Sequence, residues 1–241
     1  MSITCTCAII ACASSKGGVG KSTTCASLAG AFAHLGGTVH IIDLDANRTV
    51  SRWLQDVKTR PRAITISAPD PQQLTEHLHE LGRSVAPDFI MIDVAGAYER
   101  ALTVAAARAH LTIIPTTLAE ADVFEAEKTA GHIDQIFASF GKEAMFRLVL
   151  TKVQPLQSLA QRHTAQEIQR KQLPLLKGIM GQRAAYEEIG LSGLPPHYAD
   201  TSRETVAKAV AELDALSTEI LALLEKREPR TSALSSAGGM R

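Results

Sequence analysis

The chain has 241 residues, of which 45% are hydrophobic and 21% charged, as is typical of a folded globular protein. Lys and Arg together number 25, and so do Asp and Glu, so any affinity for nucleic acid must come from a local concentration of basic residues. Only 4% of the residues are aromatic, which argues against base-stacking surfaces for single-stranded nucleic acid. No apolar run reaches the length of a membrane span, and we expect a cytoplasmic protein.

Short apolar runs alternate with segments of helical periodicity along the whole chain. The runs predict strands at 7–13, 39–43, 64–67, 89–93, 111–115, 146–151 and 175–179. Helices are expected at 22–35, 72–81, 99–109, 121–140, 159–171 and 183–189, and a last helix carries the apolar stripe of 206–223, opened by a capping box of Thr201 and Glu204.

Strands that are apolar throughout are typical of parallel sheets covered by helices on both faces. The fold class is therefore predicted as α/β, with a single doubly wound, mostly parallel sheet. We expect one domain over 1–225 and a disordered tail over 226–241, because the tail is small, polar and glycine-bearing.

A glycine-rich loop follows the first predicted strand and reads SSKGGVGKST over positions 14–23. It matches the phosphate-binding pattern G-x-x-x-x-G-K-[ST] except that Ser15 replaces the first glycine. Backbone amides of such a loop and the following helix N-terminus bind phosphate, the lysine faces the β- and γ-phosphates, and the hydroxyl is a ligand for Mg²⁺. The expected nucleotide-binding residues are Gly17, Gly18, Val19, Gly20, Lys21, Ser22 and Thr23.

Lys16 stands five residues before Lys21, so the loop resembles the deviant Walker A sequence K-G-G-x-G-K-[ST] of the ParA/MinD family of ATPases. The resemblance implies ATP and Mg²⁺ as cofactors and an ATP-dependent homodimer in which Lys16 reaches the partner's nucleotide. In that position Lys16 would neutralise charge on the transferred phosphoryl group, as arginine fingers do.

Acidic residues follow two of the predicted strands. Asp43 and Asp45 end the second strand, and by resemblance Asp45 positions the attacking water while Asp43 supports the magnesium shell. Asp93 ends the fourth strand in a Walker B pattern, where the carboxylate holds a magnesium-bound water, and nearby Gly96 would let the backbone approach the γ-phosphate. The metal candidates are thus Ser22, Asp43 and Asp93, and the catalytic candidates are Lys16, Lys21 and Asp45.

The resemblance extends over nearly the whole chain. It places Thr151, after the sixth strand, and Pro195 near the adenine ring. The turn of residues 45–48, followed by Arg52 and Trp53, looks most like VirC1-type members, which act in conjugative DNA transfer.

The family also suggests partners. The segment 142–183 holds eight basic and two acidic residues, a net charge of +6 that is typical of nonspecific binding to double-stranded DNA, although a solvated face of two helices would look similar. The best candidates are Arg162, Arg170, Lys171 and Arg203. A lipid-binding amphipathic last helix, as in MinD-type members, is disfavoured because its polar face carries several carboxylates.

These observations favour a ParA-like, nucleoid-associated ATPase that positions or partitions DNA, with hydrolysis stimulated by a ParB-like or other adaptor. Two alternatives stay open: a P-loop enzyme that uses ATP on a small-molecule substrate, and a ParA-like positioner of a non-DNA cargo. Measuring whether the protein is retained on DNA with ATP, at two salt concentrations, would distinguish the ParA-like ATPase from the enzyme acting on a small molecule.

Overall fold

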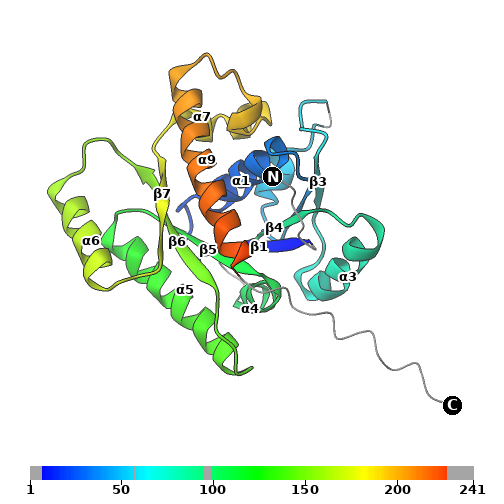
Figure 1. The fold of residues 1–241 in the computed structure, drawn as a ribbon, viewed down its shortest axis with the longest axis horizontal. Coiled ribbons are helices and arrows are strands. Elements are labelled where there is room, and N and C mark those ends of the chain that lie inside the picture. The colour runs from blue at the N-terminus through cyan, green and yellow to red at the C-terminus, as the bar shows by residue number, and fades with distance from the viewer. Residues whose placement is uncertain (1–6, 57, 95–98, 227–241) are drawn as a thin grey trace.

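A computed structural model describes residues 7–56, 58–94 and 99–226 (Figure 1). For residues 99 and 100 it describes the backbone alone. Its strands are β1 (Ala8–Cys12), β2 (Val39–Asp43), β3 (Ile64–Ser67), β4 (Phe89–Asp93), β5 (Leu111–Thr116), β6 (Phe146–Val153) and β7 (Leu175–Gly181). Its helices are α1 (Lys21–His34), α2 (Thr49–Trp53), α3 (Leu74–Ser84), α4 (Glu99–Arg108), α5 (Glu120–Ala138), α6 (Leu159–Arg170), α7 (Ala184–Glu187), α8 (Ile189–Ser192) and α9 (Glu204–Glu225), with 3-10 turns η1 (Pro71–Gln73) and η2 (Pro196–Tyr198).

The strands form one seven-stranded sheet in the order β3-β2-β4-β1-β5-β6-β7. Every pair of neighbouring strands is parallel. The predicted α/β fold is therefore confirmed. β4 and β5 lie on opposite sides of β1, so the direction in which strands are added to the sheet reverses at β1. Ligands of such sheets bind at the carboxyl ends of the strands next to this reversal.

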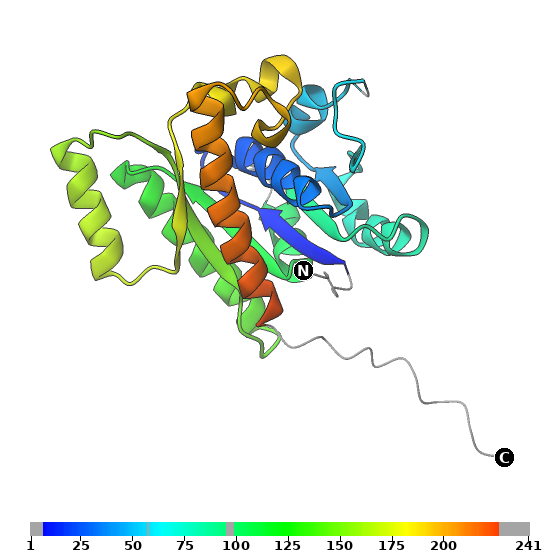
Figure 2. The ribbon, with the colours of Figure 1, turned by 45° about the horizontal axis from the view of Figure 1, so that its top comes forward.

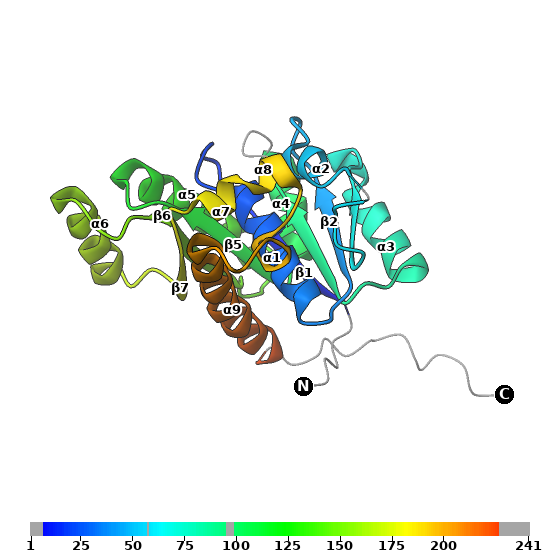
Figure 3. The same ribbon diagram turned by 90° about the horizontal axis from the view of Figure 1, so that it is seen from above.

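Helices cover both faces of the sheet (Figures 2 and 3). On one face α1 and α9 share a core cluster with β1, β4 and β7, and on the other face residues of α3 and α4 pack against β2 and β4. Side chains of α5 pack against β5 and β6 in a further cluster, and Ile168 of α6 lies against the start of α5. The apolar stripe of α9 is buried in the core, since Val206, Leu213, Leu216 and Ile220 are each 0% exposed.

Several helix boundaries differ from the prediction. The capping box of Thr201 and Glu204 is wrong: α9 begins at Glu204 after Arg203, because the carboxylate of Asp200 binds the amide and hydroxyl of Ser202 and forms a turn there instead. The single helix expected at 183–189 is two short helices, α7 and α8. The short helix α2 was not predicted.

Candidate nucleotide-binding site

The loop between β1 and α1 has the backbone of a phosphate-binding loop. Gly18 and Gly20 adopt positive φ angles of 81° and 90°, which disfavour any residue with a Cβ. Gly20 is the N-cap of α1, so Lys21 and Ser22 occupy the first turn of the helix, where backbone amides point toward an anion.

Lys21 is buried beneath this loop. Its Nζ atom donates a hydrogen bond of 3.0 Å to the carbonyl oxygen of Lys16, which ties the two ends of the loop together. Burial lowers the pKa of the Lys21 ammonium, and the negative charges of Asp93 and Asp45 oppose this effect. The Lys21 ammonium therefore lies within electrostatic reach of the buried Asp93 and the half-buried Asp45.

Asp93, at the end of β4, accepts a hydrogen bond from the Ser22 hydroxyl with an Oγ–Oδ2 distance of 2.7 Å. Asp93 is only 1% exposed, and burial raises its pKa to about 7, whereas the bond from Ser22 and the charge of Lys21 act in the opposite direction. Its other oxygen, Oδ1, is buried and has no hydrogen-bond partner within the described part of the chain. A buried, unpaired carboxylate oxygen beside a hydroxyl is a donor set that fits Mg²⁺.

Asp43 lies next to Asp93 in the sheet, because the two residues are paired in the register of β2 and β4. Both of its carboxylate oxygens accept backbone hydrogen bonds, Oδ1 from the amide of Asp45 at 3.0 Å and Oδ2 from the amide of Ser51 at 2.9 Å. Asp43 therefore fixes the turn that leads from β2 into α2. Asp45 is half-buried, and its Oδ1 atom accepts from the amide of Asn47 at 2.8 Å.

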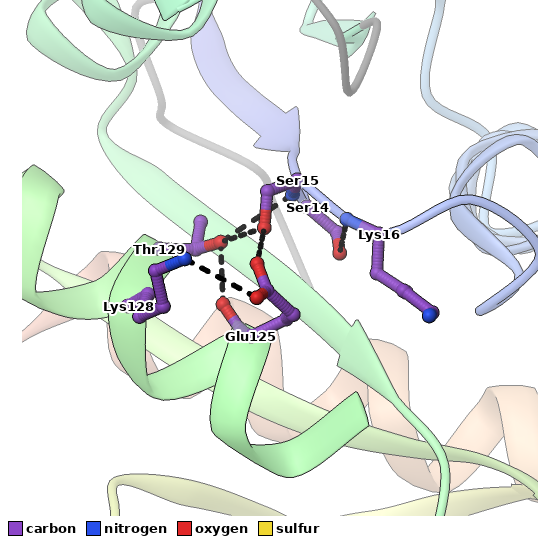
Figure 4. Close-up of polar contacts among 6 residues, drawn as sticks. All are labelled: Ser14, Ser15, Lys16, Glu125, Lys128 and Thr129. Atoms are coloured by element: carbon purple, nitrogen blue, oxygen red, sulfur yellow. Dashed lines mark hydrogen bonds and ion pairs between the residues drawn. The ribbon is translucent and has the colours of Figure 1, made fainter. Parts of the chain in front are cut away.

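Lys16 is exposed, and its side chain points away from α5 (Figure 4). Its amide donates to the hydroxyl of Ser14 at 3.1 Å. The structure therefore leaves the ammonium on the outer side of the loop, whereas Lys21 lies inside. Gly96, expected near the γ-phosphate, lies outside the described residues.

A cavity of about 240 Å³ adjoins the start of α1. Its walls include Gly20, Thr23, Trp53 and Thr151 together with residues 180–183, Tyr186 and Glu187. Thr151 also supports the loop, since its hydroxyl donates to the carbonyl oxygen of Val19 at 2.8 Å. The lining residues at and after the end of β7 were not predicted from the sequence, because this stretch matches none of the nucleotide-binding motifs used above.

Pro195, the other expected contact with the base, does not line this cavity. It packs on Gly30 of α1, where an added Cβ would lie 2.3 Å from the Pro195 Cβ. Gly30 is ten residues along the helix from Gly20, or about 15 Å away at the rise of an α-helix. The structure therefore gives Pro195 a packing role at the far end of α1.

The expected DNA-binding residues have carboxylate neighbours, with one exception. Arg170 forms an ion pair with Glu167 at 2.7 Å, Lys171 with Glu127 at 2.7 Å, and Arg203 with Glu188 at 2.6 Å. Arg183, from the same basic segment, pairs with Glu212 at 2.5 Å. Arg162 is exposed, and no ion pair is found for it among the residues that the structure describes.

The parallel sheet, the glycine loop and the hydrogen bond between Ser22 and the buried Asp93 together define a P-loop nucleotide-binding fold. The model of the CbiA family, described as the CobQ/CobB/MinD/ParA nucleotide binding domain, matches residues 10–196. The chain therefore belongs to this family, and the resemblance inferred from its loop is confirmed.

Individual proteins similar to this chain are consistent with this family assignment. The chain is 28% identical over 183 residues to protein virC1 of Rhizobium radiobacter, covering 74% of this chain and 78% of that protein. It has the fold of a Borrelia burgdorferi protein described as a plasmid partition protein bound to AMPPNP (TM-score 0.65, 17% identity, 91% of this chain and 98% of that one). It also has the fold of the septum site-determining protein MinD of Pyrococcus horikoshii complexed with Mg-ADP (TM-score 0.67, 22% identity, 90% and 97%).

Within the described ranges, no helix combines the length and the apolar character that crossing a bilayer requires.

Proposed function

We propose that this protein is a ParA-like ATPase that switches between monomer and dimer with its nucleotide. The observation that carries the proposal is the arrangement of Lys21, Ser22 and Asp93 at the carboxyl edge of the sheet, next to a loop that exposes Lys16. A P-loop enzyme would need the first three residues alone, whereas an exposed second lysine on the same loop suits a contact with another protomer.

Each residue has a distinct task in this proposal. The loop amides and the Lys21 ammonium bind the β- and γ-phosphates of ATP, and the Ser22 hydroxyl and the Asp93 carboxylate would hold Mg²⁺. When bound, Mg²⁺ neutralises phosphate charge. Asp45, on the turn held by Asp43, orients the attacking water, and Lys16 of one protomer neutralises the transferred phosphoryl group on the other.

The cavity beside α1 is the proposed site of the nucleobase and ribose, with Thr151 in its wall. Trp53 also lines it and is the single tryptophan of the chain. Nucleotide binding should therefore change the intrinsic tryptophan fluorescence, which gives a direct binding assay.

For the cargo we propose nonspecific double-stranded DNA, bound through the segment 142–183, in which Arg162 is an exposed cation without an ion pair among the described residues. The ion pairs of Arg170 and Lys171 are compatible with this role because they are solvent-exposed, with side-chain exposures of 70% and 41%. Exposed pairs of this kind are worth less than about 1 kcal/mol, so phosphate can replace the carboxylate. A cytoplasmic, nucleoid-associated location and an adaptor that stimulates hydrolysis complete the proposal.

Size-exclusion chromatography with light scattering tests the switch. The Asp45→Ala variant should be dimeric with ATP and monomeric with ADP, and adding Lys16→Ala to it should restore the monomer. A monomer under all conditions would refute the dimerising switch and favour an enzyme acting on a small molecule.

Retention on duplex DNA at two salt concentrations tests the cargo. Binding should require ATP and weaken steeply with salt. Arg162→Gln should weaken it at low salt, whereas Arg83→Gln, an exposed arginine of α3, serves as the matched control and should not. ATP-dependent dimers without DNA affinity would leave a non-DNA cargo as the function.

A further inference from the structure

Ser15, which replaces the first glycine of the phosphate-loop pattern, is bonded to a helix more than 100 residues further along the chain (Figure 4). Its hydroxyl donates to Glu125 Oε2 at 2.9 Å. Its amide donates to Thr129 Oγ1 at 3.4 Å, and the two hydroxyl oxygens are 3.2 Å apart. Serine at this position therefore makes contacts that the glycine of the pattern has no side chain to make.

The acceptor groups on α5 are themselves held in place. Thr129 is 2% exposed, and its hydroxyl donates to the carbonyl oxygen of Glu125 at 2.9 Å, so its oxygen is available to the amide of Ser15. The second carboxylate oxygen of Glu125 binds Lys128 at 3.2 Å. Glu125 and Thr129 are four residues apart and so lie on the same face of the helix.

These contacts fix the residue that precedes Lys16. The amide of Lys16 is bonded to Ser14, and its carbonyl oxygen accepts from Lys21. Ser15 thus joins the backbone directly before Lys16 to α5, in addition to the bond from Lys21 of α1, while the Lys16 side chain extends into solvent.

We propose that Glu125 and Thr129 are positioning residues that anchor Ser15 to α5 and so place the Lys16 ammonium for its reaction. The anchor follows from the contacts alone, and its effect on catalysis rests on the proposed function of Lys16. A small displacement of a group that acts on a transition state lowers the rate strongly, with losses of about 100-fold for 1 Å.

The anchor is tested by hydrogen exchange in the nucleotide-free protein. Thr129→Val keeps the shape of the side chain but removes the acceptor, and exchange of the Ser15 amide should become about fivefold faster, the value of one ordinary hydrogen bond. Thr129→Ser retains the hydroxyl and should exchange at the original rate. Unchanged exchange in Thr129→Val would overturn the anchor.

The catalytic effect is tested by separating binding from turnover. In Thr129→Val and Glu125→Ala, the Kd for ATP should stay within about twofold while kcat falls by about tenfold or more. Glu127→Ala removes another carboxylate from α5, one paired with Lys171, and should leave kcat unchanged. Equal losses in Glu127→Ala, or normal turnover in the two anchor variants, would overturn the positioning role.

These measurements also distinguish the anchor from the proposed function. If the unaltered protein neither dimerises with ATP nor hydrolyses it, the proposed function and the positioning role fall together. The exchange rates of Thr129→Val and Thr129→Ser still decide whether Ser15 is anchored to α5.

Discussion

The hydrogen bond from Ser22 to Asp93 allows a quantitative test of the site. The Asp93 carboxylate is 1% exposed, and the Ser22 hydroxyl is the donor that the structure assigns to it. At pH 8 the carboxylate is mainly charged, because its pKa is about 7. A hydrogen bond to a charged group contributes about 1.5–3 kcal/mol.

Ser22→Ala should therefore destabilise the nucleotide-free protein at pH 8 by about 2 kcal/mol. The figure of about 2 kcal/mol is the cost of losing the hydrogen bond minus about 0.5 kcal/mol, which the better helix propensity of alanine restores. With an m value of about 2 kcal/mol/M, the urea midpoint should fall by about 1 M.

Urea unfolding followed by circular dichroism measures this change. Ser22→Thr keeps a hydroxyl at the same position and should lose less than about 0.5 kcal/mol, the range of neutral substitutions. If Ser22→Ala is as stable as the unaltered protein, or if Ser22→Thr is equally destabilised, the bond does not stabilise the buried carboxylate and the argument for this site fails.

Three further predictions concern the site and a buried histidine of β2. Lys21→Ala should weaken ATP binding by about 100-fold or more, because it removes the charge that faces the phosphates; titration of Trp53 fluorescence measures it, and retained affinity would contradict the assignment. Asp45→Ala should bind ATP normally but hydrolyse it at least about 100-fold more slowly, as measured by phosphate release, and persistent turnover would exclude Asp45 as the residue that orients water. His40 of β2 is buried, and burial together with the nearby His77 lowers its pKa from 6.5 to about 4. The folded protein thus binds this proton less well than the unfolded chain, so stability is lost as pH falls from 6.5 to 4, by about 2 kcal/mol between pH 7 and pH 5. Thermal unfolding measured between pH 7 and pH 5 should show this loss of stability in the unaltered protein and a smaller loss in His40→Gln. If the stability of both proteins depends on pH in the same way, the prediction is contradicted.

The sequence by itself determined the fold class and the phosphate loop. The bounds predicted for strands 39–43 and 89–93 are those of the structure, because strands buried on both faces read as short, mainly apolar runs, here each ending in an aspartate. The loop was recognisable because its chemistry depends on consecutive residues: glycines for positive φ angles, then Lys21 and Ser22 at a helix N-terminus.

Tertiary structure alone decided which groups meet across the chain. Ser15 contacts Glu125, Pro195 packs on Gly30, and residues 180–183, Tyr186 and Glu187 line the cavity beside α1. The same holds for charge, since the net charge of a segment does not reveal that Lys171 is paired with Glu127. Such contacts depend on how helices are placed on the sheet, and that placement is set by packing between side chains that no local pattern of residues relates to one another.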